Sequence, residues 1–283
     1  MQLVKAAMIG DVVGIPGLET LEAKLPVLIK EHQLDFVTVN GENAAEGFGM
    51  TENDFKRIIA AGVDVVTSGN HVWEKRDFWT VLETERKMLR PANYPPGSPI
   101  SQIVSGAGFA YIEKKGLSWI VINLQGRELM SPIDCPFQCL DRLIKTNTGR
   151  MSDIHPLLSA DGTSVPFSFP IILVDFHAES SREKEALGYY ADGRVSLIAG
   201  THTHVQTADE KILPKGSAYI TDLGMTGNVN SVIGMNPKIC FERMSKQVMY
   251  QMETAPTETI GEIQGVIAEI DKGTGRALSI RRI

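Results

Sequence analysis

The chain has 283 residues, of which 43% are hydrophobic and 22% are charged, and its 34 acidic and 28 basic residues give a net charge of −6. These values are typical of a soluble globular protein, and the negative charge argues against nonspecific binding to duplex nucleic acid. No apolar run approaches the roughly 20 residues that a membrane helix needs, and the N-terminal residues do not form a signal peptide.

The cysteines point to a reducing compartment. Cys135, Cys139 and Cys240 do not make a disulfide framework, and no second Cys/His pair lies near the first two to complete a metal site. We therefore expect reduced thiols in a cytoplasmic protein that does not bind membranes.

The first third of the chain alternates strands and helices. Short apolar runs predict strands at 3–9, 35–39 and 64–67, and apolar positions at helical spacing predict helices at 18–32, 52–61 and 72–82. Thr51 and Asp54 form a capping-box pattern at the start of the second helix. Each strand leads through a polar, glycine-containing turn into a helix, which is typical of βαβ units.

The rest of the chain contains further strands and one irregular stretch. Strands are predicted at 102–111, 119–124, 171–175, 195–199 and 218–221, and a closing hairpin at 265–270 and 278–282. Residues 147–170 are rich in Ser, Thr, Gly, Asp and Pro and predict an irregular loop. No linker separates two domains, so we expect one α/β domain spanning residues 1–283.

Polar residues with ligand chemistry follow the predicted strands. Ligands bind beyond the carboxyl ends of parallel strands, so these side chains are expected to converge. Carboxylate, amide and imidazole groups are ligands of Mn, Fe and Zn. The set comprises Asp11, Glu42, Asn43, Asn70, His71, His177, His202 and His204.

Each of these residues also has an ordinary structural interpretation. Asp11 could cap a helix, Asn43 and Asn70 could form turns, and His177 could be a hydrogen-bonded core histidine. The occurrence of all of them at strand ends, including the His202-x-His204 pair, favours a metal site instead. His32 is assigned to a helix terminus, and His155, in the irregular loop, is given no role.

Six segments carry a family resemblance: NGENAAEGFGMT, SGNHVWEK, NLQGR, VDFHAE, GTHTHVQTADE and TDLGMTG. In this order they resemble the calcineurin-like metallophosphoesterase superfamily, and within it the YmdB-like bacterial branch. The chain lacks the D-x-H motif that most of the superfamily has at the first strand, and Glu42 stands where most members have Asp. The YmdB-like branch shares both departures.

The resemblance implies a two-sheet β-sandwich flanked by helices and a centre of two divalent ions (Fe, Mn or Zn, with Mn or Fe favoured). It implies that Asp11, Glu42, Asn43 and His204 hold one ion, and that Glu42, Asn70, His177 and His202 hold the other. A hydroxide bridging the ions would attack phosphorus, and His71 would act as the general acid that protonates the leaving oxygen. The implied function is a phosphodiesterase acting on 2′,3′-cyclic or 3′,5′-cyclic nucleotides.

Several points stay open. Glu74 is a candidate to orient His71, while Gln125, Gly126, Arg127 and the turn at 224–227 could shape the substrate site or be structural turns. The substrate-binding residues are unknown. There are two alternatives to the phosphodiesterase: a phosphomonoesterase with the same metals, and a metal-bound regulatory protein that binds a partner. The resemblance also makes a homo-oligomer plausible.

Overall fold

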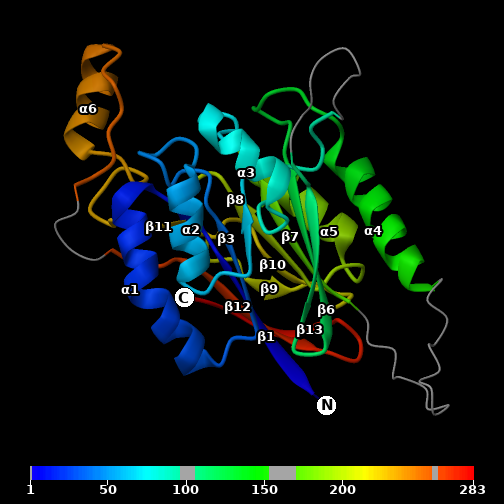
Figure 1. Ribbon diagram of the computed structural model, residues 1–283. Coiled ribbons are helices and arrows are strands. Elements are labelled where there is room, and N and C mark those ends of the chain that lie inside the picture. The colour runs from blue at the N-terminus through cyan, green and yellow to red at the C-terminus, as the bar shows by residue number, and fades with distance from the viewer. Residues whose placement is uncertain (1, 96–105, 153–169, 257–260) are drawn as a thin grey trace.

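Two β-sheets pack face to face and carry helices on both outer faces (Figure 1). The computed structural model describes residues 2–95, 106–152, 170–256 and 261–283. The first sheet has the order β13 (Ala277–Arg282), β12 (Gly265–Asp271), β1 (Leu3–Ile9), β3 (Phe36–Asn40) and β4 (Val65–Thr67). The second has the order β5 (Phe109–Lys114), β6 (Leu117–Gln125), β7 (Ile171–His177), β8 (Leu197–Thr201), β10 (Ala218–Ile220) and β9 (Lys211–Ile212). This arrangement confirms the predicted α/β sandwich.

The central strands of both sheets run parallel. In the first sheet β1, β3 and β4 are parallel neighbours, and in the second β6, β7, β8 and β10 are. A separate short ladder pairs β2 (Asp11–Val12) with β11 (Met225–Thr226). Parallel strands place their carboxyl ends at one edge of the sheet, and the polar turns follow at that edge.

The core lies in three apolar layers. Residues of β1, β12, β6, β7 and β8 fill the space between the sheets, where the rings of Phe36 and Trp119 stack at 4.5 Å. α1 (Gly14–His32) and α2 (Glu52–Ala60) cover the outer face of the first sheet. α4 (Pro136–Ser152) and α5 (Ser181–Ala191) cover the outer face of the second. Because both faces of the central strands are buried, their sequences are continuous apolar runs.

Several predicted elements are confirmed. Thr51 and Asp54 form the capping box at the start of α2. The closing hairpin is the antiparallel pair β12–β13. The three cysteines are free thiols, and no helix in the described ranges is long and apolar enough to cross a membrane.

The largest differences from the prediction include the start of the first helix, which was expected at 18 and begins at Gly14. The helix expected at 72–82 begins later, because residues 70–75 form turns, followed by a 3₁₀ turn (Arg76–Phe78) and α3 (Trp79–Thr84). The strand expected from 102 begins at Phe109, and 102–105 lie outside the described residues. The loop expected at 147–170 is wrong over 147–152, which continue α4, and 153–169 lie outside the described residues.

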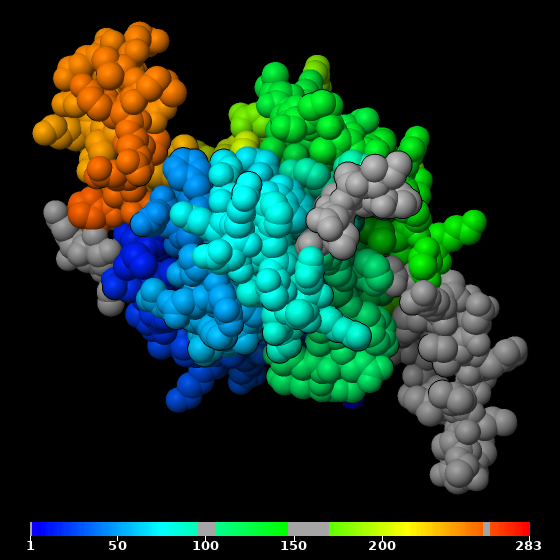
Figure 2. Space-filling model, turned by 45° about the horizontal axis from the view of Figure 1, so that its top comes forward, coloured from blue at the N-terminus to red at the C-terminus, as the bar shows by residue number. Residues whose placement is uncertain are grey.

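One part of the chain stands away from the sandwich. α6 (Pro237–Lys246) and the segment after it form what we call the α6 lobe, residues 235–254, which projects from the rest of the surface (Figure 2). A β-bridge between Met235 and Thr254 closes its base. The lobe exposes large apolar side chains, including Phe241 and Met244.

Candidate metal centre

Every predicted site residue lies where a central strand has just ended. Glu42 and Asn43 follow β3, Asn70 and His71 follow β4, and Asp11 begins β2 shortly after β1. In the second sheet, His177 ends β7, and His202 and His204 follow β8. The two sheets therefore bring their polar turns together at one edge of the sandwich.

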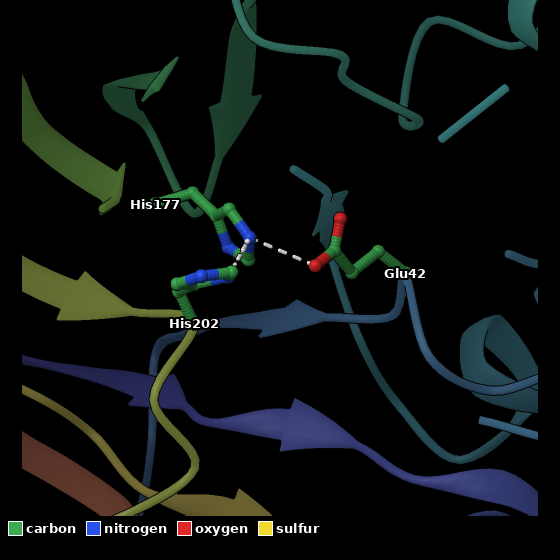
Figure 3. A group of neighbouring side chains, drawn as sticks. All are labelled: Glu42, His177 and His202. Carbon is green, nitrogen blue, oxygen red and sulfur yellow. Dashed lines mark hydrogen bonds and ion pairs between the residues drawn. The ribbon is translucent and has the colours of Figure 1, made fainter. Parts of the chain in front are cut away.

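The first group of ligand atoms surrounds Nε2 of His177 (Figure 3). Oε1 of Glu42 lies 2.8 Å from this nitrogen, and Oδ1 of Asn70 and Nδ1 of His202 each lie 3.0 Å from it. Glu42 and His177 are fully buried. Four donor atoms from four separate turns thus meet at one point.

The second group adjoins the first. Nδ2 of Asn43 lies 3.4 Å from Oδ1 of Asp11 and 3.0 Å from Nε2 of His204, and that imidazole nitrogen is 3.6 Å from the Asp11 carboxylate. The backbone N–H of His202 donates to Oδ2 of Asp11 at 3.3 Å, which joins this group to the first. All seven residues expected to be ligands therefore lie in two adjoining groups. We treat the binding of metal ions by these groups as a proposal.

Each histidine is turned by a partner outside the cluster. Nδ1 of His177 bonds the Thr201 hydroxyl at 3.0 Å, which in turn donates to Asp175 at 2.7 Å. Nδ1 of His204 lies 2.9 Å from the carbonyl of Ile233. Such partners fix the ring and direct the other nitrogen to the metal. His202 is held the opposite way, with Nε2 3.1 Å from Glu179 and Nδ1 facing His177.

The charges of the cluster depend on one another. Burial alone would lower the pKa of His204, but its bond to Asp11 and the Asp11 charge raise that pKa to about 9. Burial alone would raise the pKa of Asp11, but the bond to His204 and its charge lower it to about 2. Burial and the charge of His177 lower the pKa of His202 to about 4. A metal ion would have to displace the proton from Nε2 of His204 before this nitrogen could bind the ion.

The residues fit divalent ions. Oε1 of Glu42 is buried and lies 2.8 Å from Nε2 of His177, which can donate to it only when the imidazole carries a proton at that nitrogen. A buried carboxylate is costly unless a donor or a positive charge lies beside it, and either a protonated His177 or a metal ion meets that requirement. Atoms that share an ion at about 2.1 Å lie roughly 3–3.5 Å apart, close to the spacing around His177. Asn70 already presents its oxygen, whereas the Asn43 amide would have to turn over, because its nitrogen faces the site.

The histidine-bearing turn is held in an uncommon backbone conformation. His202 has φ +101° and His204 has φ +63°, values that side-chain-bearing residues rarely adopt. The turn is anchored by Asp222, which accepts from the Thr203 N–H at 3.3 Å and binds Lys184 at 2.6 Å in a fully buried ion pair. Backbone strain of this kind persists where surrounding contacts over-determine it, often at functional sites.

His71 lies beside the cluster rather than among its ligand atoms. Its backbone N–H donates to Oε2 of Glu42 at 3.0 Å. Its Nδ1 lies 3.3 Å from Oε1 of Glu74, the predicted orienting residue, and its ring meets Phe48 edge to face at 5.1 Å. The His71 side chain is 26% exposed, so part of it faces solvent.

The remaining candidates divide into structural and site-facing residues. The backbone N–H of Gly126 donates to the His177 carbonyl at 2.9 Å and that of Arg127 donates to the Glu183 carboxylate at 3.0 Å, so both hold the turn after β6 in place. In the turn at 224–227, the Gly224 carbonyl accepts from the Asp11 N–H at 3.2 Å and so positions a ligand. Gln125 pairs in register with His177.

The side chain of Gln125 is held on one side only. Its Oε1 accepts from the Tyr94 hydroxyl at 3.1 Å, and its buried Nε2 has no partner among the described residues. Asn93 fixes the Gln125 backbone by two hydrogen bonds, of 2.8 and 2.9 Å. Gln125 is thus rigidly placed next to the cluster with one donor group unused.

Sequence reasoning missed the supporting partners. Asp175 and His177 are two residues apart on β7, so their side chains share a face, and this spacing could have revealed the pair. Thr201 directly precedes the H-x-H motif. The Ile233 carbonyl has no sequence signal, because a backbone group can come from any residue.

The sequence also matches a known protein family. The model for the YmdB-like protein family matches residues 7–283. The chain belongs to the YmdB-like family. It is 40% identical over 275 residues to the 2′,3′-cyclic-nucleotide 2′-phosphodiesterase of Bacillus subtilis (strain 168), covering 97% of this chain and 94% of that protein.

Two solved structures share the fold over almost the whole chain. A phosphatase from Mycoplasma pneumoniae, described as novel, has a TM-score of 0.84 and 32% identity, covering 100% of this chain and 93% of that one. A hypothetical protein from Thermus thermophilus has a TM-score of 0.81 and 35% identity, covering 99% of this chain and 98% of that one. Family and neighbours confirm the predicted resemblance and the prediction of a phosphoesterase enzyme.

Gly69 gives a direct test of the cluster. A Cβ added there would lie 2.1–2.3 Å from atoms of the His177 ring, which is buried and cannot move aside. We expect Gly69→Ala to displace His177 and weaken the ion held by its group by about 10–100-fold or more, so that bound metal falls from about two ions per chain toward one. Metal content by elemental analysis measures this. The control is Gly273→Ala, whose Cβ meets only Asp271 at 3.4 Å. Full metal content in Gly69→Ala would contradict the proposed role of His177.

Proposed function

We propose that this enzyme is a metal-dependent phosphodiesterase that uses two divalent ions to hydrolyse 2′,3′-cyclic nucleotides. The observation that carries the proposal is the pair of adjoining donor groups, one at the buried Glu42 carboxylate and His177 and the other at Asp11, joined by the His202 N–H. The name of the Bacillus subtilis relative supports the substrate class.

The ligand assignment follows the two groups. Asp11, Glu42, Asn43 and His204 would hold one ion, and Glu42, Asn70, His177 and His202 the other. The nitrogen and oxygen donors suit Mn or Fe, and also Zn. When bound, two divalent ions supply positive charge for the phosphate and activate water as the nucleophile.

The protein's own contribution centres on His71. Its backbone is tied to Glu42, so its ring is kept at a fixed place beside the cluster. Glu74 at Nδ1 and Phe48 at the ring edge set its orientation. In the proposed reaction, Nε2 of the protonated ring donates a proton to the sugar oxygen that leaves phosphorus.

One alternative has a specific observation in its favour. The Mycoplasma pneumoniae neighbour is described as a phosphatase, so the same site could act on phosphomonoesters. Four other points stay predictions from the sequence. They are hydrolysis of 3′,5′-cyclic nucleotides, a homo-oligomeric state, a cytoplasmic location and the regulatory-protein alternative.

Substrate hydrolysis tests the proposed activity. With Mn²⁺, the purified protein should hydrolyse 2′,3′-cyclic AMP faster than the monoester p-nitrophenyl phosphate, and chelator should abolish this activity until metal is restored. Product formation is followed by chromatography, with 3′,5′-cyclic AMP in parallel. Preferential monoester hydrolysis would establish the phosphatase instead, and no hydrolysis by metal-loaded protein would overturn the proposal.

A substitution separates proton donation from metal binding. His71→Ala should keep both metals but reduce kcat on 2′,3′-cyclic AMP by about 10²–10⁴-fold, the range for loss of a general acid. His32→Ala is the control, because His32 lies at the end of α1, where it contacts Arg281. A wild-type kcat in His71→Ala on a diester with a poor leaving group would show that His71 is not the acid.

A further inference from the structure

A cavity of about 580 Å³ opens between the α6 lobe and the loop that follows Glu42 and Asn43. This volume lies within the range of small-molecule sites, about 300–1,000 Å³. Its walls combine aromatic, apolar and charged side chains, among them Ala45, Phe48, Lys75, Arg243, Tyr250 and Met252.

The cavity adjoins the proposed general acid. Phe48 lines the cavity and also contacts the His71 ring, at 5.1 Å between ring centroids. Lys75 lies four residues beyond His71 and belongs to the same wall. A group that occupied the cavity would therefore contact Phe48, the ring that packs against His71.

The opposite wall is connected to the ligand cluster. The Ile233 carbonyl, which bonds His204, lies two residues before Met235 at the base of the lobe. Met235 also packs on Gly47, where an added Cβ would lie 2.5 Å from the methionine methyl group. The cavity thus lies between two elements that both contact site residues.

The wall formed by the lobe is already ordered. The Arg243 guanidinium donates to the Tyr250 carbonyl at 2.8 Å, and the Asn236 N–H donates to the Glu253 carbonyl at 2.9 Å. These bonds hold the segment that carries Tyr250 against α6. Binding would then need little reordering of the chain, which favours affinity.

The lining chemistry favours a neutral aromatic group. Lys75 and Arg243 are balanced by Glu46 and Glu253, so the cavity has no net charge to attract a second phosphate. Phe48 and Tyr250 are the aromatic residues of the lining, and bases stack on aromatic rings regardless of base identity. The polar groups around them can hydrogen-bond the edges of a heterocycle.

We propose that this cavity binds the nucleobase of the substrate, with Phe48 and Tyr250 as its aromatic contacts. The inference rests on the proposed function, because it places the sugar between His71 and the cavity. It gives a function to the α6 lobe, which projects from the sandwich and is not part of its two sheets.

Binding measurements test this without turnover. Metal-loaded protein should bind adenosine 3′-monophosphate more tightly than the base-free 1-O-methylribose 3-phosphate. Tyr250→Ala should weaken adenosine 3′-monophosphate about 10–100-fold, the loss expected for one stacked base, and leave the base-free ligand unchanged. Phe241→Ala is the control, because Phe241 is a 59% exposed aromatic residue of the same lobe outside the cavity lining. Titration calorimetry gives the dissociation constants.

The outcomes distinguish the two proposals. The proposed base site would be overturned by any of three results: Tyr250→Ala weakens both ligands equally, it weakens neither, or Phe241→Ala has the same effect as Tyr250→Ala. Hydrolysis of 2′,3′-cyclic AMP and of its base-free analogue with equal kcat/KM would also overturn the base site and leave the phosphodiesterase in place. Base-selective binding without hydrolysis of any cyclic diester would support the base site and overturn the proposed activity.

Discussion

The arrangement of the site depends on one buried carboxylate. Glu42 is inaccessible to water, and its Oε1 faces Nε2 of His177 at 2.8 Å. A carboxylate in this setting is costly unless positive charge lies beside it. Burial alone would lower the pKa of His177, but the charge of Glu42, its hydrogen bond to the ring and the charges of Asp11 and Asp175 together raise that pKa. A divalent ion would meet the same requirement with more charge, while leaving His177 free to act as a neutral ligand.

The sandwich explains how such a cluster can exist. Parallel strands in two facing sheets deliver polar turns to one edge, and the apolar layers behind them keep those turns from relaxing apart. The partners behind the ligands are also buried. Asp175 accepts hydrogen bonds from Thr67, Thr201 and Asn40, which ties β3, β4, β7 and β8 together directly beneath the site. The fold and the histidine orientation are thus stabilised by the same contacts.

The positions of the site residues were predictable from the sequence, because they follow the ends of strands. Strand ends are local features, since an apolar run stops and a Gly-containing polar turn follows, as at Asn70 and His202. The site residues could therefore be named before their contacts were known. The α3 start was not predictable in this way, because the turn at 70–75 is held by contacts such as the His71 N–H to Glu42, 29 residues away.

The parts that sequence reasoning did not find depend on distant contacts. The Ile233 carbonyl at His204 joins segments 29 residues apart, and a backbone acceptor carries no sequence signature. The α6 lobe was not predicted as an element, and its relation to Phe48 arises only when the chain folds back through Met235 and Thr254. These contacts connect the cluster to the cavity.

The number of metal ions per chain tests the central role of Glu42 most directly. Elemental analysis of purified protein, with chain concentration from amino-acid analysis, should give about two ions per chain, as two ligand groups require. Glu42→Gln should hold fewer than about one, because the amide cannot supply the shared negative charge. Glu74→Gln makes the same chemical change at an exposed neighbour of His71 and should retain both. Two ions retained in Glu42→Gln, or no more than one in the wild type, would contradict this account of the site.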